Sequence, residues 1–270
     1  LMQEMRRGGY EFYTGTSYRH LLIHKFGSVV ELTAPHDILT KRIGEYLPQD
    51  AVLREMMETS YRILSNHPLN LERKAKGLNP ANSVWGAGTR PMLTSFEEKY
   101  HKKGAMISAV DLLKGIAVGA GLDNIIVEGA NGGLHTNYTG KAEAAVDALA
   151  AQDYDFVYVH IEAPDEMGHQ GSIPDKIKAI ENIDQKIIGP IVGEMEDLCM
   201  DFRTLVLPDH PTPICVRTHT GNPVPYLLYD SRKKAEGMPE YSERLGNKSP
   251  LFEKEGHRLL SRLFEMDNER

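Results

Sequence analysis

Five acidic and histidine side chains could bind metal ions, because they lie at or soon after the ends of two apolar runs. They are Asp165, His169, Asp209, His210 and His219. The apolar runs 156–161 and 205–207 precede the two acid and histidine pairs. Two carboxylates and three imidazoles form a mixed oxygen and nitrogen donor set that suits Zn²⁺ or Mn²⁺, and two such ions can hold a phosphoryl group from both sides.

Both apolar runs predict buried parallel strands, because they are short and are followed by Gly and Pro. Open α/β sheets build their sites beyond the carboxyl ends of such strands. Asp165 and His169 are four residues apart, so a single turn lets both point into one space. A lone D-x-x-x-H motif is most often an ordinary solvent-exposed pair. The second pair, Asp209 and His210, and the later His219 make the metal hypothesis the stronger one.

The motifs HIEAPDEMGHQG, LPDHPTP and RTHTGNPVPYLLYD give the chain a family resemblance. With them the chain resembles the alkaline phosphatase superfamily, and within it the cofactor-independent phosphoglycerate mutases of the archaeal type and their bacterial relatives proposed as homoserine kinases. The segments GTSYRHLL, NSVWGAG, ISAVDLLKGI and TNYTGKAEAA look similar as well. The resemblance therefore covers nearly the whole chain, and its metal motifs are the most specific part.

The resemblance implies interconversion of 2- and 3-phosphoglycerate through a phosphoserine intermediate, without 2,3-bisphosphoglycerate. It implies two divalent ions, Mn²⁺ or Zn²⁺ with Mg²⁺ as a further candidate. Asp165, His169 and His219 would bind one ion. Asp209 and His210 would bind the other, which the family completes with an aspartate at the end of the first strand and a serine nucleophile.

No position in this chain matches that aspartate or that serine. We therefore expect that the chain starts inside the family's inserted cap domain and that the nucleophile lies upstream of residue 1. Three functions remain open on the sequence alone: a phosphoglycerate mutase, a homoserine kinase-like phosphotransferase, and an inactive metal-binding fragment.

Three basic side chains are implied to bind the substrate. Arg19 and Arg90 lie in the cap region of the resembling family, where the forked donors of guanidinium suit phosphate and carboxylate. Lys114 matches a lysine that binds the transferred phosphoryl group. The alternative is an ordinary solvated side chain, which is as plausible as binding for Arg19 and the stronger interpretation for Arg90 and Lys114. The chain differs from the family pattern at His135, where the family commonly has an aspartate.

Composition narrows the class of partner. The 270 residues include 31 basic and 38 acidic ones, for a net charge of −7, and contain no long basic run, which argues against nucleic acid. The two cysteines, Cys199 and Cys215, form no C-x-x-C motif, which favours a reducing cytoplasm. No signal peptide or long apolar run predicts a membrane partner. We expect a small phosphorylated substrate, with a missing N-terminal segment or a second copy of the chain as protein partners.

The pattern of helices and strands predicts two domains. Residues 1–103 should form a smaller α+β cap, with a strand at 18–26 and a helix at 50–65. Residues 104–270 should form the C-terminal part of an alkaline-phosphatase-like α/β core, whose mostly parallel sheet carries helices on both faces.

Two details of this core follow from the sequence. Strands 154–161 and 203–207 should share its sheet, and one sheet edge should be unpaired because the family's first strands are unmatched. A helix that starts near Ser172 should be kinked by Pro190 and should bury one apolar stripe. That stripe consists of Ile177, Ile180, Ile183, Ile187, Ile191 and Met195.

Overall fold

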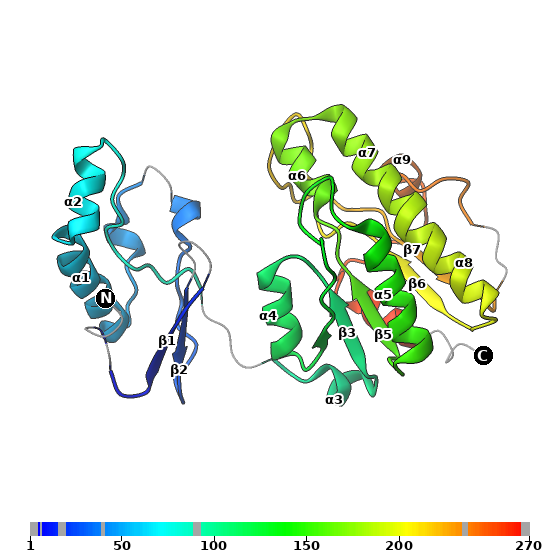
Figure 1. Cartoon of the computed structure of the whole chain (residues 1–270), viewed down its shortest axis with the longest axis horizontal. Helices are drawn as coiled ribbons and strands as arrows, with labels where there is room; N and C mark the ends of the chain where they lie inside the picture. Colours follow the sequence, from blue (N-terminus) through cyan, green and yellow to red (C-terminus); the bar gives the residue numbers. More distant parts are fainter. Residues whose placement is uncertain are drawn as a thin grey trace. The chain divides into compact units, whose positions relative to one another are not determined.

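The computed structural model describes residues 5, 7–15, 20–38, 41–88, 93–233 and 237–265. They belong to two compact units, Leu1–Met92 and Leu93–Arg270 (Figure 1). The division falls before the boundary expected at 103, because α3 (Phe96–Tyr100) packs within the second unit: the ring centroid of Phe96 lies 5.1 Å from that of Phe156. The assignment of the first unit as a cap stays a prediction.

The described part of the first unit contains a β-hairpin, two α-helices and two short 3-10 turns. Their bounds are Tyr10–Thr14 (β1), His20–His24 (β2), Pro35–Ile38 and Ile43–Tyr46 (3-10), Ala51–Ser65 (α1) and Pro68–Ala75 (α2). The hairpin is antiparallel, with the Tyr10 and His24 rings stacked at 4.0 Å. Asp50 caps α1 by accepting a 2.9 Å hydrogen bond from the Leu53 amide. The strand and the helix expected in this unit are both confirmed.

Helices and strands alternate through most of the second unit. After α3, the elements in order are Gly104–Ile107 (β3), Asp111–Gly119 (α4), Asp123–Asn124 (β4), Tyr138–Ala151 (α5), Phe156–Val159 (β5), Ala163–Gln170 (α6), Ile173–Ile183 (α7), Asp184–Ile188 (a π turn), Gly189–Asp197 (α8), Arg203–Val206 (β6), Leu227–Asp230 (β7), Glu243–Gly246 (α9) and Arg258–Glu265 (α10).

A parallel sheet in the order β4-β3-β5 forms the centre of this unit. All four residues of β3 are buried, and a Cβ atom on Gly104 would lie 2.4 Å from the end of the Leu122 side chain, which would have to shift to admit a larger residue. Side chains alternate across β5. Phe156 packs on Phe264 of α10, whereas Val159 packs on the cluster that includes Ala142 of α5. Helices thus cover both faces, and the expected α/β fold is confirmed.

The expectation that the strands near 156 and 205 share one sheet is wrong. Strand β5 is the last strand of the parallel sheet, and β6 pairs antiparallel with β7 in a separate two-stranded sheet. Packing rather than backbone pairing connects the two: Phe264 contacts the Phe156 ring, and its carbonyl accepts a 3.3 Å hydrogen bond from Arg203 of β6. Among the described strands, β5 and β6 each lie at an edge of their sheet, as do β4 and β7, so the expected unfinished edge stays a prediction.

The isoleucine stripe is only half buried. Ile187 and Met195 are buried, but Ile177 and Ile180 are each 53% exposed, and Ala179 takes the buried position in α7. The cause is the π turn between α7 and α8, because a wider turn shifts which side of a helix faces the core. Pro190 lies in the first turn of α8, directly after the π turn, and the kink expected at this proline stays a prediction.

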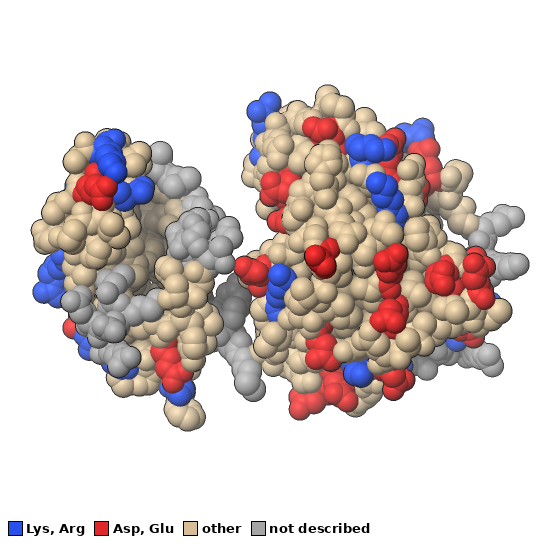
Figure 2. All heavy atoms as spheres, viewed as in Figure 1, with Lys and Arg blue, Asp and Glu red and all other residues tan. Residues whose placement is uncertain are grey.

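Charged and apolar side chains are mixed on the surface. Figure 2 shows acidic and basic side chains interspersed on the face that it draws.

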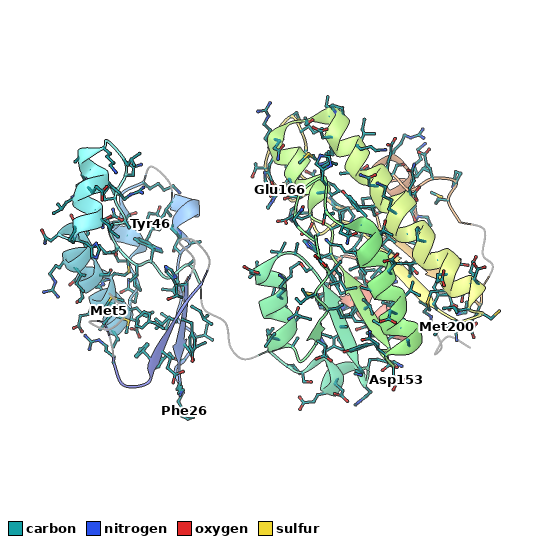
Figure 3. All side chains as sticks on the ribbon, in the orientation of Figure 1. Met5, Phe26, Tyr46, Asp153, Glu166 and Met200 are labelled. Carbon is teal, nitrogen blue, oxygen red and sulfur yellow. The ribbon has the colours of Figure 1, made fainter. Side chains whose placement is uncertain are left out.

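At the start of β5, Asp153 takes a left-handed φ of 59°, a conformation that aspartate tolerates, and thereby turns the chain from α5 into the strand (Figure 3). None of the helices in the described ranges is long and apolar enough to span a membrane.

Candidate metal centre

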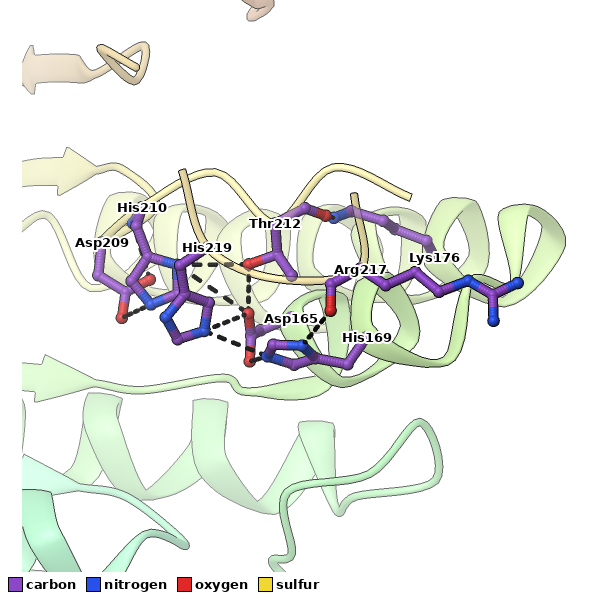
Figure 4. A network of polar contacts seen from close by, with 8 residues as sticks. All are labelled: Asp165, His169, Lys176, Asp209, His210, Thr212, Arg217 and His219. Carbon is purple, nitrogen blue, oxygen red and sulfur yellow. Dashed lines mark hydrogen bonds and ion pairs between the residues drawn. The ribbon is translucent and has the colours of Figure 1, made fainter. Parts of the chain in front are cut away.

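Helix α6 places Asp165 and His169 on one face, because residues four apart lie one turn above each other. His219 approaches them from the loop between β6 and β7. The Nε2 atom of His169 lies 3.2 Å from Asp165 Oδ2 and 3.1 Å from His219 Nε2, and His219 Nε2 lies 3.5 Å from Asp165 Oδ1 (Figure 4). One ligand atom from each of the three residues lies within 4.8 Å of the other two.

The tautomer of His169 favours the binding of a cation between these three side chains. Nδ1 of His169 lies 3.0 Å from the carbonyl oxygen of Arg217, which only accepts, so Nδ1 carries the proton and Nε2 keeps its lone pair. That lone pair faces both a carboxylate and a second imidazole nitrogen. One carboxylate and two imidazoles, of which His169 is oriented by a backbone carbonyl, form a donor set that fits a divalent ion such as Zn²⁺.

The second predicted pair lies directly beside this cluster. Asp209 Oδ2 is 3.3 Å from His210 Nε2, and His210 Nδ1 is 4.0 Å from Asp165 Oδ1. The His210 and His219 rings lie 3.7 Å apart. The structure therefore brings all five predicted donors into one place, as two adjoining groups.

Two residues that the sequence did not single out connect these groups. Thr212 is only 4% exposed, and its hydroxyl donates a hydrogen bond to Asp165 Oδ1. The hydroxyl oxygen of Thr212 also lies 3.3 Å from His210 Nδ1. Lys176 of α7 donates from Nζ to the Thr212 carbonyl at 2.7 Å. The motif PDHPTP contains Thr212, but no spacing rule tells which carboxylate its hydroxyl meets.

A buried lysine supports the strand end below the site. Lys141 of α5 is 1% exposed, and its Nζ donates to the His160 carbonyl at 3.0 Å. Burial lowers the pKa of Lys141, whereas the charge of Glu162 opposes that shift. Burial also lowers the pKa of His160, so this imidazole is neutral near pH 7. These residues fix the end of β5, from which the chain continues into α6 and Asp165.

Of the three predicted substrate-binding residues, the structure describes only Lys114. Arg19 and Arg90 lie outside the described residues. Lys114 lies on α4, where its Nζ is 3.5 Å from Asp111 Oδ1 on the same helix. The role of each of these three residues stays a prediction.

Comparison with known proteins gives a consistent result. The Metalloenzyme superfamily profile matches residues 15–259. Over 247 residues the chain is 50% identical to the 2,3-bisphosphoglycerate-independent phosphoglycerate mutase of Methanosarcina barkeri, covering 87% of this chain and 62% of that protein. It is 44% identical over 263 residues to the probable mutase of that name from Geobacter sulfurreducens, covering 95% of this chain and 65% of that protein.

Two solved structures have a similar fold. A Pyrococcus horikoshii protein matches with a TM-score of 0.66 and 33% identity, over 80% of this chain and 56% of that one. The cofactor-independent phosphoglycerate mutase from Thermoplasma acidophilum matches with a TM-score of 0.61 and 24% identity, over 97% of this chain and 66% of that one, which supports the fold alone.

The chain thus spans a little under two thirds of the length of the curated relatives, 62% for the Methanosarcina barkeri protein. Within that span, the match of the superfamily profile includes all five predicted metal ligands. The resemblance seen in the motifs is confirmed, and the chain belongs to the Metalloenzyme superfamily.

Proposed function

We propose that this chain carries the metal-binding part of a 2,3-bisphosphoglycerate-independent phosphoglycerate mutase. The proposal rests on one observation: two groups of metal donors lie side by side. The first group is Asp165, His169 and His219, and the second is Asp209 and His210. Relatives named as such mutases, at 44–50% identity, support the choice of reaction.

Each group of donors has its own part in the proposal. Asp165, His169 and His219 hold one divalent ion, and Asp209 with His210 contributes to the other. We propose Mn²⁺ or Zn²⁺, with Mg²⁺ as a further candidate, because imidazole and carboxylate together suit the first two. When bound, such ions neutralise charge on a transferring phosphoryl group and lower the pKa of a nearby hydroxyl.

The reaction would proceed in two transfers. A serine oxygen forms a bond to the phosphorus of 3-phosphoglycerate as the bond from phosphorus to the C3 oxygen breaks, and the serine proton passes to that leaving oxygen. After the glycerate reorients, its C2 oxygen takes the phosphoryl group and returns a proton to the serine. We place this serine outside the 270 residues, and we propose that Arg19, Arg90 and Lys114 bind the anionic substrate.

The test is a coupled enolase assay on the complete reading frame that encodes these residues, with Mn²⁺ and without 2,3-bisphosphoglycerate. We expect turnover there, background activity for the 270 residues alone, and background activity for Asp209→Ala and His210→Ala in the complete protein. Glu194→Gln, on the exposed side of α8, is the matched control and should keep the parent's activity.

A parallel assay with ATP and homoserine separates the competing reaction. Phosphorylation of homoserine without mutase turnover would overturn the proposal in favour of a kinase. Mutase turnover by the 270 residues alone would show that the nucleophile lies within this chain.

A further inference from the structure

Thr212 belongs to neither group of donors, yet its hydroxyl contacts both. Its hydroxyl oxygen contacts Asp165, which belongs to the first group of donors, and also His210, which belongs to the second (Figure 4). The residue is 4% exposed, so water does not compete freely for that hydroxyl. One buried hydroxyl therefore connects the two groups.

The single proton of this hydroxyl determines the direction of both hydrogen bonds. The ionised Asp165 carboxylate only accepts, so Thr212 donates to it. The hydroxyl oxygen then has only lone pairs left for His210 Nδ1, 3.3 Å away. His210 must donate from Nδ1, which leaves the lone pair on Nε2, the nitrogen that lies 3.3 Å from Asp209 Oδ2.

The backbone around Thr212 is fixed as well. Its carbonyl accepts the 2.7 Å hydrogen bond from Lys176, and the neighbouring Pro211 carbonyl accepts one of 3.1 Å from the Thr220 amide. Helix α6 approaches so closely that a Cβ atom on Gly168 would lie 2.6 Å from the Thr212 carbonyl oxygen. The hydroxyl is thus held in place by α6, α7 and the loop that leads to β7.

We propose that Thr212 is a positioning residue that fixes the Nδ1–H tautomer of His210 and the orientation of the Asp165 carboxylate, and so couples the two metal sites. His169 has the same arrangement, with Nδ1 donating to a carbonyl and Nε2 free to bind. The inference rests on the metal sites of the proposed function but not on the mutase reaction, so metal binding tests it even where no turnover is seen.

The experiment compares Thr212→Val, which keeps the shape and loses the hydroxyl, with Thr212→Ser, which keeps the hydroxyl. Thr139→Val, at an exposed position of α5, is the matched control. Calorimetric titration with Mn²⁺ should give a Kd about 10- to 100-fold higher for Thr212→Val, the usual effect of removing a hydrogen-bonding partner of a ligand. The Kd values of Thr212→Ser and Thr139→Val should stay close to the parent's.

The second readout is the tautomer itself, measured by long-range ¹⁵N–¹H correlation on the neutral His210 ring of the metal-free chain. We expect the His210 proton on Nδ1 in the parent, and loss of that preference in Thr212→Val. A proton on Nε2 in the parent would overturn the inference, and this measurement needs no variant to fold. An unchanged Mn²⁺ affinity in a folded Thr212→Val would overturn it too.

Discussion

Asp165 is the residue on which the polar network converges. Its two carboxylate oxygens face three imidazoles, from His169, His210 and His219, and the hydroxyl of Thr212. A negatively charged carboxylate surrounded by imidazole nitrogens attracts a divalent cation more strongly than the imidazoles alone would. Asp165 should therefore contribute more to metal affinity than any residue that only supports it.

We expect Asp165→Asn to reduce Mn²⁺ binding below detection, because the change removes the one negative charge of the first group of donors. This loss should exceed the change of about 10- to 100-fold that removal of a supporting hydrogen bond causes. Isothermal titration measures both. Glu166→Gln, one residue further along α6, is the control and should bind as the parent does; equal losses in the two variants would contradict a specific role for Asp165.

The sequence predicts the donors of this site better than it predicts their supports. Asp165 and His169 could be recognised because helical spacing places them on one face, and Asp209 and His210 because they follow a strand-like run. Thr212 and Lys176 could not be, since their contacts depend on how α6, α7 and a loop pack together. No pattern in the sequence encodes that packing.

At the scale of elements, β5 and β6 each have one side that no described strand pairs with. The Phe156 amide donates to the Lys103 carbonyl just before β3 at 3.2 Å, and the His160 amide just after β5 donates to the Ile107 carbonyl of β3 at 2.9 Å, so the even-numbered amides of this segment face β3. Those of Val157 and Val159 must then face the other way. Among the described strands, none pairs with that side.

Hydrogen exchange measured by NMR tests this description. The amides of Val157 and Val159 should exchange faster than those of Tyr158 and His160, because only the latter two are bonded within the sheet. In the 270-residue chain we expect the difference to recur in β6, with Leu205 faster than Thr204. Equal protection of all amides in β5 would mean that another strand covers this edge.

Strand existence and strand partnership are predictable from sequence to different degrees. The apolar runs at 156–161 and 205–207 gave the right strands, but an apolar run contains no information about its neighbour. The chain pairs the second run with β7 in antiparallel register, Arg203 opposite Asp230, and not with β5. The π turn after α7 was missed for a similar reason, because it changes the helical period locally.

A buried ion pair holds the β6–β7 ribbon to α10. The Asp230 side chain is 2% exposed and accepts hydrogen bonds from Arg232 and Arg203, at 2.9 and 3.0 Å. Arg203 also donates to the Leu263 carbonyl at 3.1 Å. The hydrogen bonds from Arg232, and then those from Arg203, hold the pKa of Asp230 well below its usual range.

We expect Asp230→Ala to lower the free energy of unfolding by about 3–5 kcal/mol at pH 7, because it removes the carboxylate that neutralises the guanidinium of Arg203, whose side chain is 13% exposed. A depressed carboxyl pKa stabilises the fold above the unfolded value of about 3.9. That contribution is lost as pH falls through the lower folded value, so the gap between parent and variant should narrow in acid. Urea titrations at pH 7 and at pH 3 measure it, and a gap independent of pH would contradict the assigned cause.

At the scale of the whole molecule, all five proposed metal ligands belong to the second unit, Leu93–Arg270. The chain's one tryptophan, Trp85, belongs to the first, where its Nε1 donates to the Thr33 carbonyl at 2.8 Å. Tryptophan fluorescence therefore reports on the first unit, while far-ultraviolet circular dichroism reports on the helices of both. The two signals distinguish where a bound ion acts.

We expect Zn²⁺ to raise the midpoint of the circular dichroism transition and to leave the Trp85 transition nearly unchanged. An ion that binds only the folded state raises the free energy of unfolding by about 2.7 kcal/mol when its free concentration is about one hundred times its Kd. The unit that contains the ligands is the one that is stabilised. A chelator should reverse the shift, and Asp165→Asn should abolish it. If instead the Trp85 midpoint rises by the same amount as the circular dichroism midpoint, the two units unfold together and the ion stabilises the chain as one cooperative structure.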